Sequence, residues 1–253
     1  METAQLAEEI NGSKIKLLQC SFEIPSTVIR IPNSFYIYLA EDLQTLAEVL
    51  KKLSFELTTK ILCYDDGSLE AACRVWWGLQ GAGYTNSCVL NGGITKWVSE
   101  YGTVQRGAPL APPMKEDFYN SFNEAFYCTQ EDLVELGPEK SQKVVAGKEF
   151  KYLVSEHCGL KEMQEVVLFF KTSEIDLIDT RLTAVSGEMA GVVVFLLKVL
   201  GRNNLSFCIE HPERTESTET VYYSYSEAFI VQRPVSSNNY SKIQFKGCTC
   251  NLF

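Results

Sequence analysis

Two kinds of residue in this 253-residue chain stand where they could take part in chemistry: carboxylates at strand ends and one thiol beside a histidine. Asp65 follows the apolar run ILCY, and Asp179 follows EIDLI, so both are predicted at the carboxyl end of a buried strand. An Asp at this place commonly begins a turn. In SEHCGL, His157 adjoins Cys158 and could lower the pKa of its thiol. A helix that ends at Gly159 explains the same residues.

The other cysteines are expected to be mostly reduced and buried. There are nine in all, an odd number, in a chain that is not small and shows no export signal. Cys63, Cys88 and Cys208 lie within apolar runs, where a thiol packs as a small hydrophobic group. Cys73 follows on a predicted helix near Arg74 and is also expected to pack.

Metal and cofactor sites are not indicated. The two histidines are far apart, and Cys248 and Cys250 form a C-x-C pair without a second pair. Neither a G-x-G-x-x-G fingerprint nor a phosphate-binding G-x-x-x-x-G-K-[ST] loop occurs. We therefore expect no cofactor.

The last four residues, Cys250-Asn-Leu-Phe, fit a loose prenylation box in which a terminal Phe directs geranylgeranyl transfer. Cys248 would then be available for a second lipid. Asn251 is polar where an aliphatic residue is usual, and short matches of this kind arise by chance. The alternatives are lipidation at Cys250, with marginal membrane binding, or no modification.

Charge and hydropathy narrow the class of protein. The net charge of −9 argues against nucleic acid as a partner, because phosphate binding needs a basic face. No apolar run is long enough to cross a membrane, and residues 190–200 have the length of a buried helix. The acidic N-terminus does not resemble a secretory or transit signal. These features predict a cytoplasmic location, with mitochondrial import without a cleaved presequence as the alternative.

Strand and helix patterns alternate along the first part of the chain. Apolar, β-branched runs predict strands, and apolar residues at helical spacing predict helices. In chain order the predicted elements are a strand at 15–22, a strand segment at 26–39 that Pro32 breaks, a helix at 41–53, a strand at 61–64, a helix at 69–79, a strand at 87–90 and a helix at 94–101. This alternation is typical of an α/β domain with a parallel sheet.

The pattern recurs after a Pro- and Gly-rich segment. The sequence at 163–179 has the plan of 46–65, a helix, a polar break and a strand that ends in Asp, which aligns Asp179 with Asp65. The alternative is that any two βαβ units look alike. The predicted organisation is a first domain at 14–106, a linker at 107–118, a second domain at 119–221 and an extension at 222–253.

One segment carries a specific resemblance. KILCYDDGSLEAACRVWWGLQGAGYTNSCVLNGGITKWVSEYG, at 60–102, resembles the non-catalytic domain of the tandem rhodanese and mercaptopyruvate sulfurtransferases. The resemblance implies an α/β fold of two rhodanese-like copies with parallel sheets and helices on both faces, the second copy eroded. In that family a Cys after a central strand takes sulfur from thiosulfate or mercaptopyruvate. Here Asp65 and Asp179 stand at the matching positions, which predicts a degenerate member without the catalytic Cys. The family's HIPGA-like segment is also missing, and IPNSFYI at 31–37 is the nearest remnant.

Three functions follow as hypotheses. The first is a catalytically inactive structural or adaptor subunit of a larger protein assembly, with aromatic segments at 118–127 and 222–232 that either dock on partners or cover the core. The second is a sulfurtransferase that uses a displaced thiol, Cys158. The third is a binding module in the old loop, where Asp65 and Asp66 count against an anionic ligand. Trp76 and Trp77 are predicted to pack in the core or between the two halves, and not to form a ligand platform.

Overall fold

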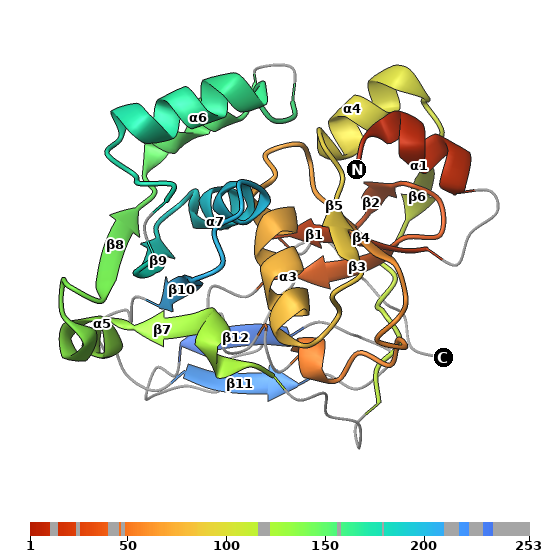
Figure 1. Cartoon of the computed structure of the whole chain (residues 1–253). Coiled ribbons are helices and arrows are strands. Elements are labelled where there is room, and N and C mark those ends of the chain that lie inside the picture. The colour runs from red at the N-terminus through yellow and green to blue at the C-terminus, as the bar shows by residue number, and fades with distance from the viewer. Residues whose placement is uncertain are drawn as a thin grey trace.

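The structure is a computed structural model. It describes residues 1–10, 15–23, 26–39, 46, 49–115, 122–155, 158–178, 180–209, 218–222 and 230–234. Two four-stranded parallel sheets lie side by side, one in each half of the chain (Figure 1). This confirms the predicted α/β class with parallel sheets.

The first sheet has the strand order β3-β1-β4-β5. Its strands are β1 (Lys16–Ser21), β3 (Phe35–Tyr38), β4 (Ile61–Tyr64) and β5 (Ser87–Val89). The break predicted at Pro32 is confirmed: the chain turns at Pro32 and Asn33, where Asn33 has a φ of 62°, and strands lie on either side. The first piece, β2 (Val28–Arg30), pairs instead with β6 (Gln105–Gly107).

Helices cover both faces of this sheet, as predicted. On one face lies α3 (Glu70–Gly81), whose small and aromatic residues bury against β1 and β4. On the other face lie α4 (Gly93–Glu100) and a helix that the sequence did not predict, α1 (Thr3–Glu9). Leu6 of α1 and Trp97 of α4 are buried there with Leu62 and Tyr64 of β4. Of the helix predicted at 41–53, Leu46 and residues 49–51 are helical and other residues fall outside the described part.

The second sheet has the order β7-β10-β9-β8. Its strands are β7 (Tyr127–Thr129), β8 (Ser141–Val145), β9 (Leu182–Ser186) and β10 (Leu205–Ile209). The helices are α5 (Gln130–Leu136), α6 (Met163–Thr172) and α7 (Ala190–Val199), with short 3-10 segments η1 (Glu124–Phe126) and η2 (Lys148–Leu153). Farther along, β11 (Thr218–Tyr222) pairs antiparallel with β12 (Ile230–Pro234) across the predicted boundary at 221.

The strand predicted to end at Asp179 is wrong. Residues 175–178 form no strand, and the central strand β9 begins only at Leu182. The reason is burial: Ile178 is 88% exposed, whereas Ala184 and Val185 of β9 are fully buried. A central strand covered on both faces needs such continuous burial. Asp179 itself lies outside the described residues.

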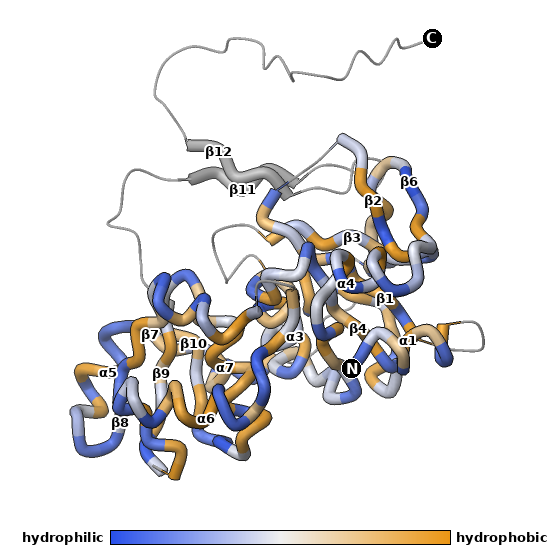
Figure 2. Tube along the Cα trace, turned by 90° about the horizontal axis from the view of Figure 1, so that it is seen from above, coloured by the Kyte–Doolittle hydropathy of each residue, from blue (hydrophilic) through white to orange (hydrophobic). Residues whose placement is uncertain are grey.

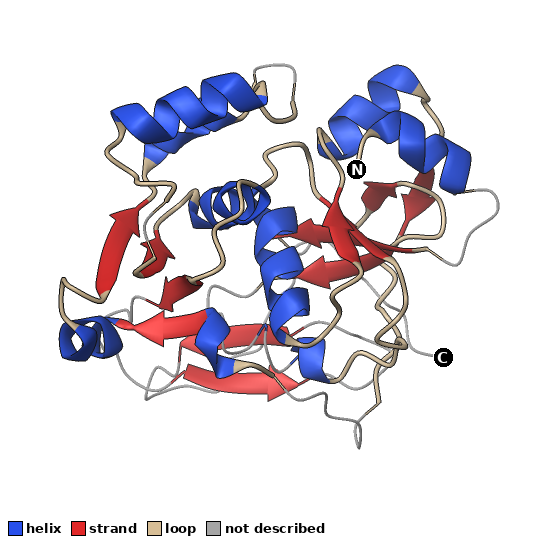
Figure 3. Cartoon of the chain, in the orientation of Figure 1, coloured by secondary structure: helices blue, strands red, loops and turns tan. Residues whose placement is uncertain are grey.

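The two halves meet where α3 packs against α7 (Figure 3). The tube in Figure 2 is coloured hydrophobic along most of α7, which has no charged residue before Lys198. Trp76 of α3 lies edge-on to Phe195 of α7, with ring centroids 4.9 Å apart, and Trp77 donates a hydrogen bond to the Phe126 carbonyl. The predicted packing of both tryptophans between the halves is confirmed, and one hydrophobic core runs through both halves.

The close packing of α3 against α7 depends on Gly191. A Cβ placed on Gly191 would lie 2.9 Å from the Glu70 carbonyl oxygen and 3.1 Å from the Arg74 amide nitrogen. Both atoms belong to the α3 backbone and cannot move aside separately.

We therefore expect Gly191→Ala to destabilise the chain by roughly 1–3 kcal/mol, because the added methyl group forces α3 and α7 apart. Urea unfolding measures the change in free energy. Val199→Ala, at an exposed position on the same helix, is the control and should change the stability by less than about 1 kcal/mol. Equal effects of the two substitutions would contradict a close-packed crossing at Gly191.

Candidate functional site

The carboxyl ends of two central strands form the candidate site. β4 lies between β1 and β5 and is followed by α3, and β9 lies between β8 and β10 and is followed by α7. In open parallel sheets, loops at this end of the central strands are the usual place for a ligand or a reactive side chain. The residues there are Asp65, directly after β4, and Ser186, the last residue of β9.

Asp65 is held by its own loop and helix. Its carboxylate accepts hydrogen bonds from the backbone amides of Gly67, Leu69 and Ala72, at 2.9, 3.1 and 3.2 Å, and from the Ser68 hydroxyl. The side chain is almost fully buried, and this burial raises its pKa while the amide hydrogen bonds oppose the rise. The amides that could stabilise a bound anion are therefore occupied by the protein itself.

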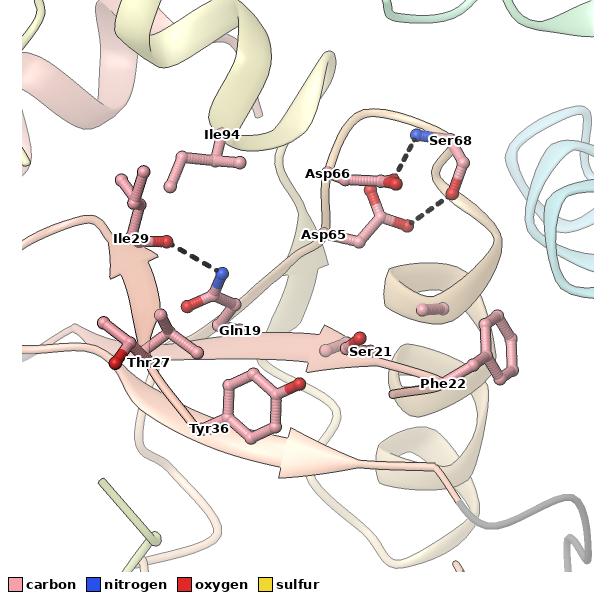
Figure 4. A pocket seen from close by; sticks show the side chains of 13 residues that line it. Gln19, Ser21, Phe22, Thr27, Ile29, Tyr36, Asp65, Asp66, Ser68 and Ile94 are labelled. Atoms are coloured by element: carbon pink, nitrogen blue, oxygen red, sulfur yellow. Dashed lines mark hydrogen bonds between the residues drawn. The ribbon is translucent and has the colours of Figure 1, made fainter. Parts of the chain in front are cut away.

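A cavity of about 340 Å³ opens beside Asp65 (Figure 4). Its lining includes the carboxylates of Asp65 and Asp66 but no Lys, Arg or His among the described residues that form it. Gln19 contributes a buried Oε1 with no hydrogen-bond partner in the described part, while its Nε2 donates to the Ile29 carbonyl at 3.0 Å. An acidic wall of this kind disfavours anionic ligands such as thiosulfate.

Ser186 takes the place where the sequence predicted Asp179. It pairs with Val145 of β8 much as Tyr64, next to Asp65, pairs with Gln19 of β1. Its hydroxyl is buried and has no hydrogen-bond partner among the described residues. A serine hydroxyl without an adjacent base is not activated for attack.

The amides that begin α7 are occupied by a carboxylate from the other half of the chain. Glu70 of α3 accepts hydrogen bonds from the Gly191 and Val192 amides at 3.1 and 3.2 Å. Arg74 binds the same carboxylate at 2.5 Å and donates to the Gly187 carbonyl at 3.1 Å. Burial raises the pKa of Glu70, and the Arg74 guanidinium and the two amides oppose that rise.

The preceding amides of this loop are also satisfied within the protein. The Met189 amide donates to the Ala146 carbonyl at 3.0 Å, and the Ala190 amide donates to the Gly187 carbonyl at 3.3 Å. Together with the two amides on Glu70, four consecutive residues at the start of α7 direct their N–H groups at protein oxygens.

Cys158 comes from a distant segment of the sequence and packs against the loop that follows Asp65. A Cβ placed on Gly67 would be 2.8 Å from the Cys158 sulfur, so thiol and loop are in contact. The neighbouring Leu160 amide donates to Asn91 Oδ1 at 2.7 Å, which fixes the segment to the turn at Gly92. Cys158 is partly exposed and adopts a left-handed φ of 60°, while His157 lies outside the described residues. Cys158 thus approaches the first loop and not the end of β9.

The remaining thiols follow the sequence predictions with one exception. Cys63, Cys73 and Cys208 are buried as predicted, whereas Cys88 is half-buried. Cys248 and Cys250 lie outside the described residues. No group of three or more His, Cys, Asp or Glu side chains suited to a metal ion occurs within the described part. Among the described helices, none combines the length and apolarity needed to span a membrane.

Comparison with known proteins shows a family similarity for the first half of the chain. The family model of the rhodanese-like domain matches residues 2–100. This part of the chain is similar to rhodanese-like domains. The sequence is 24% identical over 102 residues to a 3-mercaptopyruvate sulfurtransferase of Escherichia coli K12, and 26% identical over 105 residues to that of Mus musculus. These matches span 40% and 41% of this chain but only 36% and 35% of the relatives.

Solved structures show the same fold over more of the chain. The crystal structure of SseA from Escherichia coli, described as having the rhodanese fold of the 3-mercaptopyruvate sulfotransferases, gives a TM-score of 0.66 at 18% identity, over 82% of this chain and 96% of that one. An anaerobic ergothioneine biosynthesis enzyme from Chlorobium limicola gives 0.64 at 14% identity, over 80% and 65%. The rhodanese-like fold therefore extends beyond residue 100.

Sequence reasoning missed Glu70 and Ser186. Glu70 reads locally as an acidic residue in the first turn of its own helix, where it is favourable in any case. Its amide partners are 121 and 122 residues away, and no local pattern reveals such a contact. Ser186 was missed because the strand was predicted seven residues too early.

We expect Asp65→Ala to destabilise the chain by roughly 1–3 kcal/mol, because three buried backbone amides lose their acceptor. Urea unfolding provides the measurement. Asp66→Ala is the matched control: this carboxylate is exposed and accepts one loop amide, from Ser68. The interpretation of Asp65 as the acceptor that organises the loop fails if Asp66→Ala costs as much.

Glu70 should make stability depend on pH in a defined direction. Its pKa is raised above the ordinary 4.5 in the folded chain, so its contribution is fully present below that value and is lost as the pH rises through the folded pKa. The stability of the wild type relative to Glu70→Gln should therefore be greatest near about pH 4.5 and should decrease toward neutral pH. Thermal unfolding of both proteins across this range tests the sign. Glu188→Gln, at an exposed position in the loop before α7, is the control for the removal of one acidic side chain.

Proposed function

We propose that this protein is a catalytically inactive tandem rhodanese-like protein that serves as a structural or adaptor subunit of a larger protein assembly. The observation that carries this proposal is that internal carboxylates occupy both candidate anion sites. Asp65 binds the amides of its own loop, and Glu70 of the first half binds the first amides of α7 in the second half. A persulfide is an anion and needs those amides.

The tandem arrangement is part of the proposal. It is supported by the corresponding places of β1 and β8, of β4 and β9, and of β5 and β10 in the two sheets. A helix follows β4 and β9 in each case, and α3 and α7 then pack together. Under this correspondence the nucleophile position of the second copy falls at Ser186, so Ser stands where the family's catalytic domain has Cys, and Asp65 fits the family's silent first domain.

The exposed apolar side chains support a role in assembly. Among the described residues, every large apolar side chain that is at least half exposed belongs to the second half: Val134, Val145, Tyr152, Leu168, Ile178 and Val199. Single exposed apolar residues are ordinary, but this concentration on one half favours a protein partner there. The described aromatic residues of 118–127 contribute differently, since Phe122, Phe126 and Tyr127 pack against the core.

The alternative is a sulfurtransferase that uses Cys158. It is favoured by the contact of this partly exposed thiol with the loop at Gly67. In such a reaction the Cys158 thiolate attacks the outer sulfur of thiosulfate, sulfite leaves with the bonding electron pair, and a persulfide remains. The acidic cavity beside the same loop opposes the approach of the donor.

One experiment separates the two functions. The tagged protein is purified gently, sized, and assayed with thiosulfate and mercaptopyruvate, and its cysteines are examined for persulfide by mass spectrometry. The proposal predicts a large assembly without sulfur transfer above the rate without protein. Persulfide on Cys158, with activity lost in Cys158→Ser, would establish the alternative.

Two variants test the assembly surface. Leu168→Lys, at a position that is 63% exposed on α6, should leave the unfolding temperature unchanged and reduce co-purification of partners. Val98→Lys, at a position that is 44% exposed on α4 of the first half, is the control and should retain the partners. If Val98→Lys releases the partners and Leu168→Lys does not, the surface lies on the first half.

A further inference from the structure

Cys128 and Cys208 stand opposite each other on adjacent strands. Register pairs Cys208 of β10 with Cys128 of β7, and paired residues of neighbouring strands point to the same face of a sheet. Both residues belong to the small buried cluster that includes Leu133 of α5. Adjacent strands lie about 4.8 Å apart. This spacing is within the range of about 4.4–6.8 Å between Cα atoms that a disulfide accepts.

We propose that Cys128 and Cys208 are a redox site that closes to a disulfide and ties the edge strand β7 to β10. The oxidant is a small disulfide of the glutathione class. One cysteine thiolate attacks a sulfur of this disulfide and releases one thiol. The second cysteine then attacks the mixed disulfide and releases the other thiol, so that two protein thiols are oxidised and one small disulfide is reduced.

Access and strand pairing distinguish this pair from Cys20 and Cys63 of the first sheet. Cys63 of β4 stands opposite Leu18 of β1, so Cys20 is placed diagonally to it. Cys63 is fully buried beneath α3, whereas Cys128 is 7% exposed under the seven-residue helix α5. A short helix with few buried residues opens locally more readily than the core. Oxidation is therefore expected at Cys128 and Cys208 first.

The consequence of closure is mechanical. β7 is three residues long and lies at the edge of its sheet, where it pairs only with β10 among the described strands. A bond from Cys128 to Cys208 encloses nearly the whole second half in one covalent loop, which restricts the unfolded chain. Oxidation should thus stabilise the second half.

The test uses the full chain. The reduced protein, freed of reductant, is incubated with oxidised glutathione, blocked with an alkylating reagent, digested, and analysed by mass spectrometry without reduction. The expected result is a cross-linked peptide pair that contains residues 128 and 208, and a rise of several degrees in the unfolding temperature that a dithiol reductant reverses. Cys128→Ser should lose both effects, and Cys63→Ser should keep them.

Three results would overturn the proposal. In the first, glutathione stays attached to Cys128 or Cys208. In the second, the cross-link forms only in urea. In the third, Cys20 and Cys63 form a disulfide before Cys128 and Cys208 do. The first two are read on the wild-type protein, so the test holds even if a serine variant does not fold. None of these results bears on the absence of sulfur transfer.

Discussion

The carboxylate of Glu70 is the interaction on which the two-part structure depends. It comes from the first half of the chain and accepts hydrogen bonds from the first backbone amides of α7 in the second half. Arg74 forms an ion pair with it. A buried charge is costly unless it is paired and hydrogen-bonded; Arg74 of the same helix supplies the pairing, and the two amide hydrogen bonds form only when the halves are together. The apolar contacts around Trp76 add area to this junction, but the carboxylate fixes how α3 and α7 meet.

The two sheets are incomplete in complementary ways. The first carries β3 on the outer edge of β1, and in the described part of the second nothing corresponds to it beside β8. The second carries β7 beyond β10, and the described part of the first shows no strand beyond β5. Within the described residues the two sheets therefore differ at their edges, and one hydrophobic core that includes α3 and α7 joins them.

Much of the fold could be predicted from the sequence, because a change of hydrophobic period between strand and helix is a local signal. The strand at 61–64 and the packing of Trp77 are examples. The strand predicted before Asp179 was wrong because EIDLI has the composition of a strand, whereas the exposure of Ile178 depends on tertiary packing that the local sequence does not show. The site was harder still: Asp65 bonds to its own loop and was predictable, but Glu70 acts across the halves and leaves no trace in spacing.

The position of Glu70 also limits what the loop before α7 could bind. A cysteine introduced at Ser186 would place a thiol at the end of β9, yet the first amides of α7 would remain bound to a fixed carboxylate from the other half. A second substitution that removed this carboxylate would free the amides, but it would also take from Arg74 its ion-pair partner. Two coupled substitutions, one in each half of the chain, would therefore be needed before this loop could hold an anion.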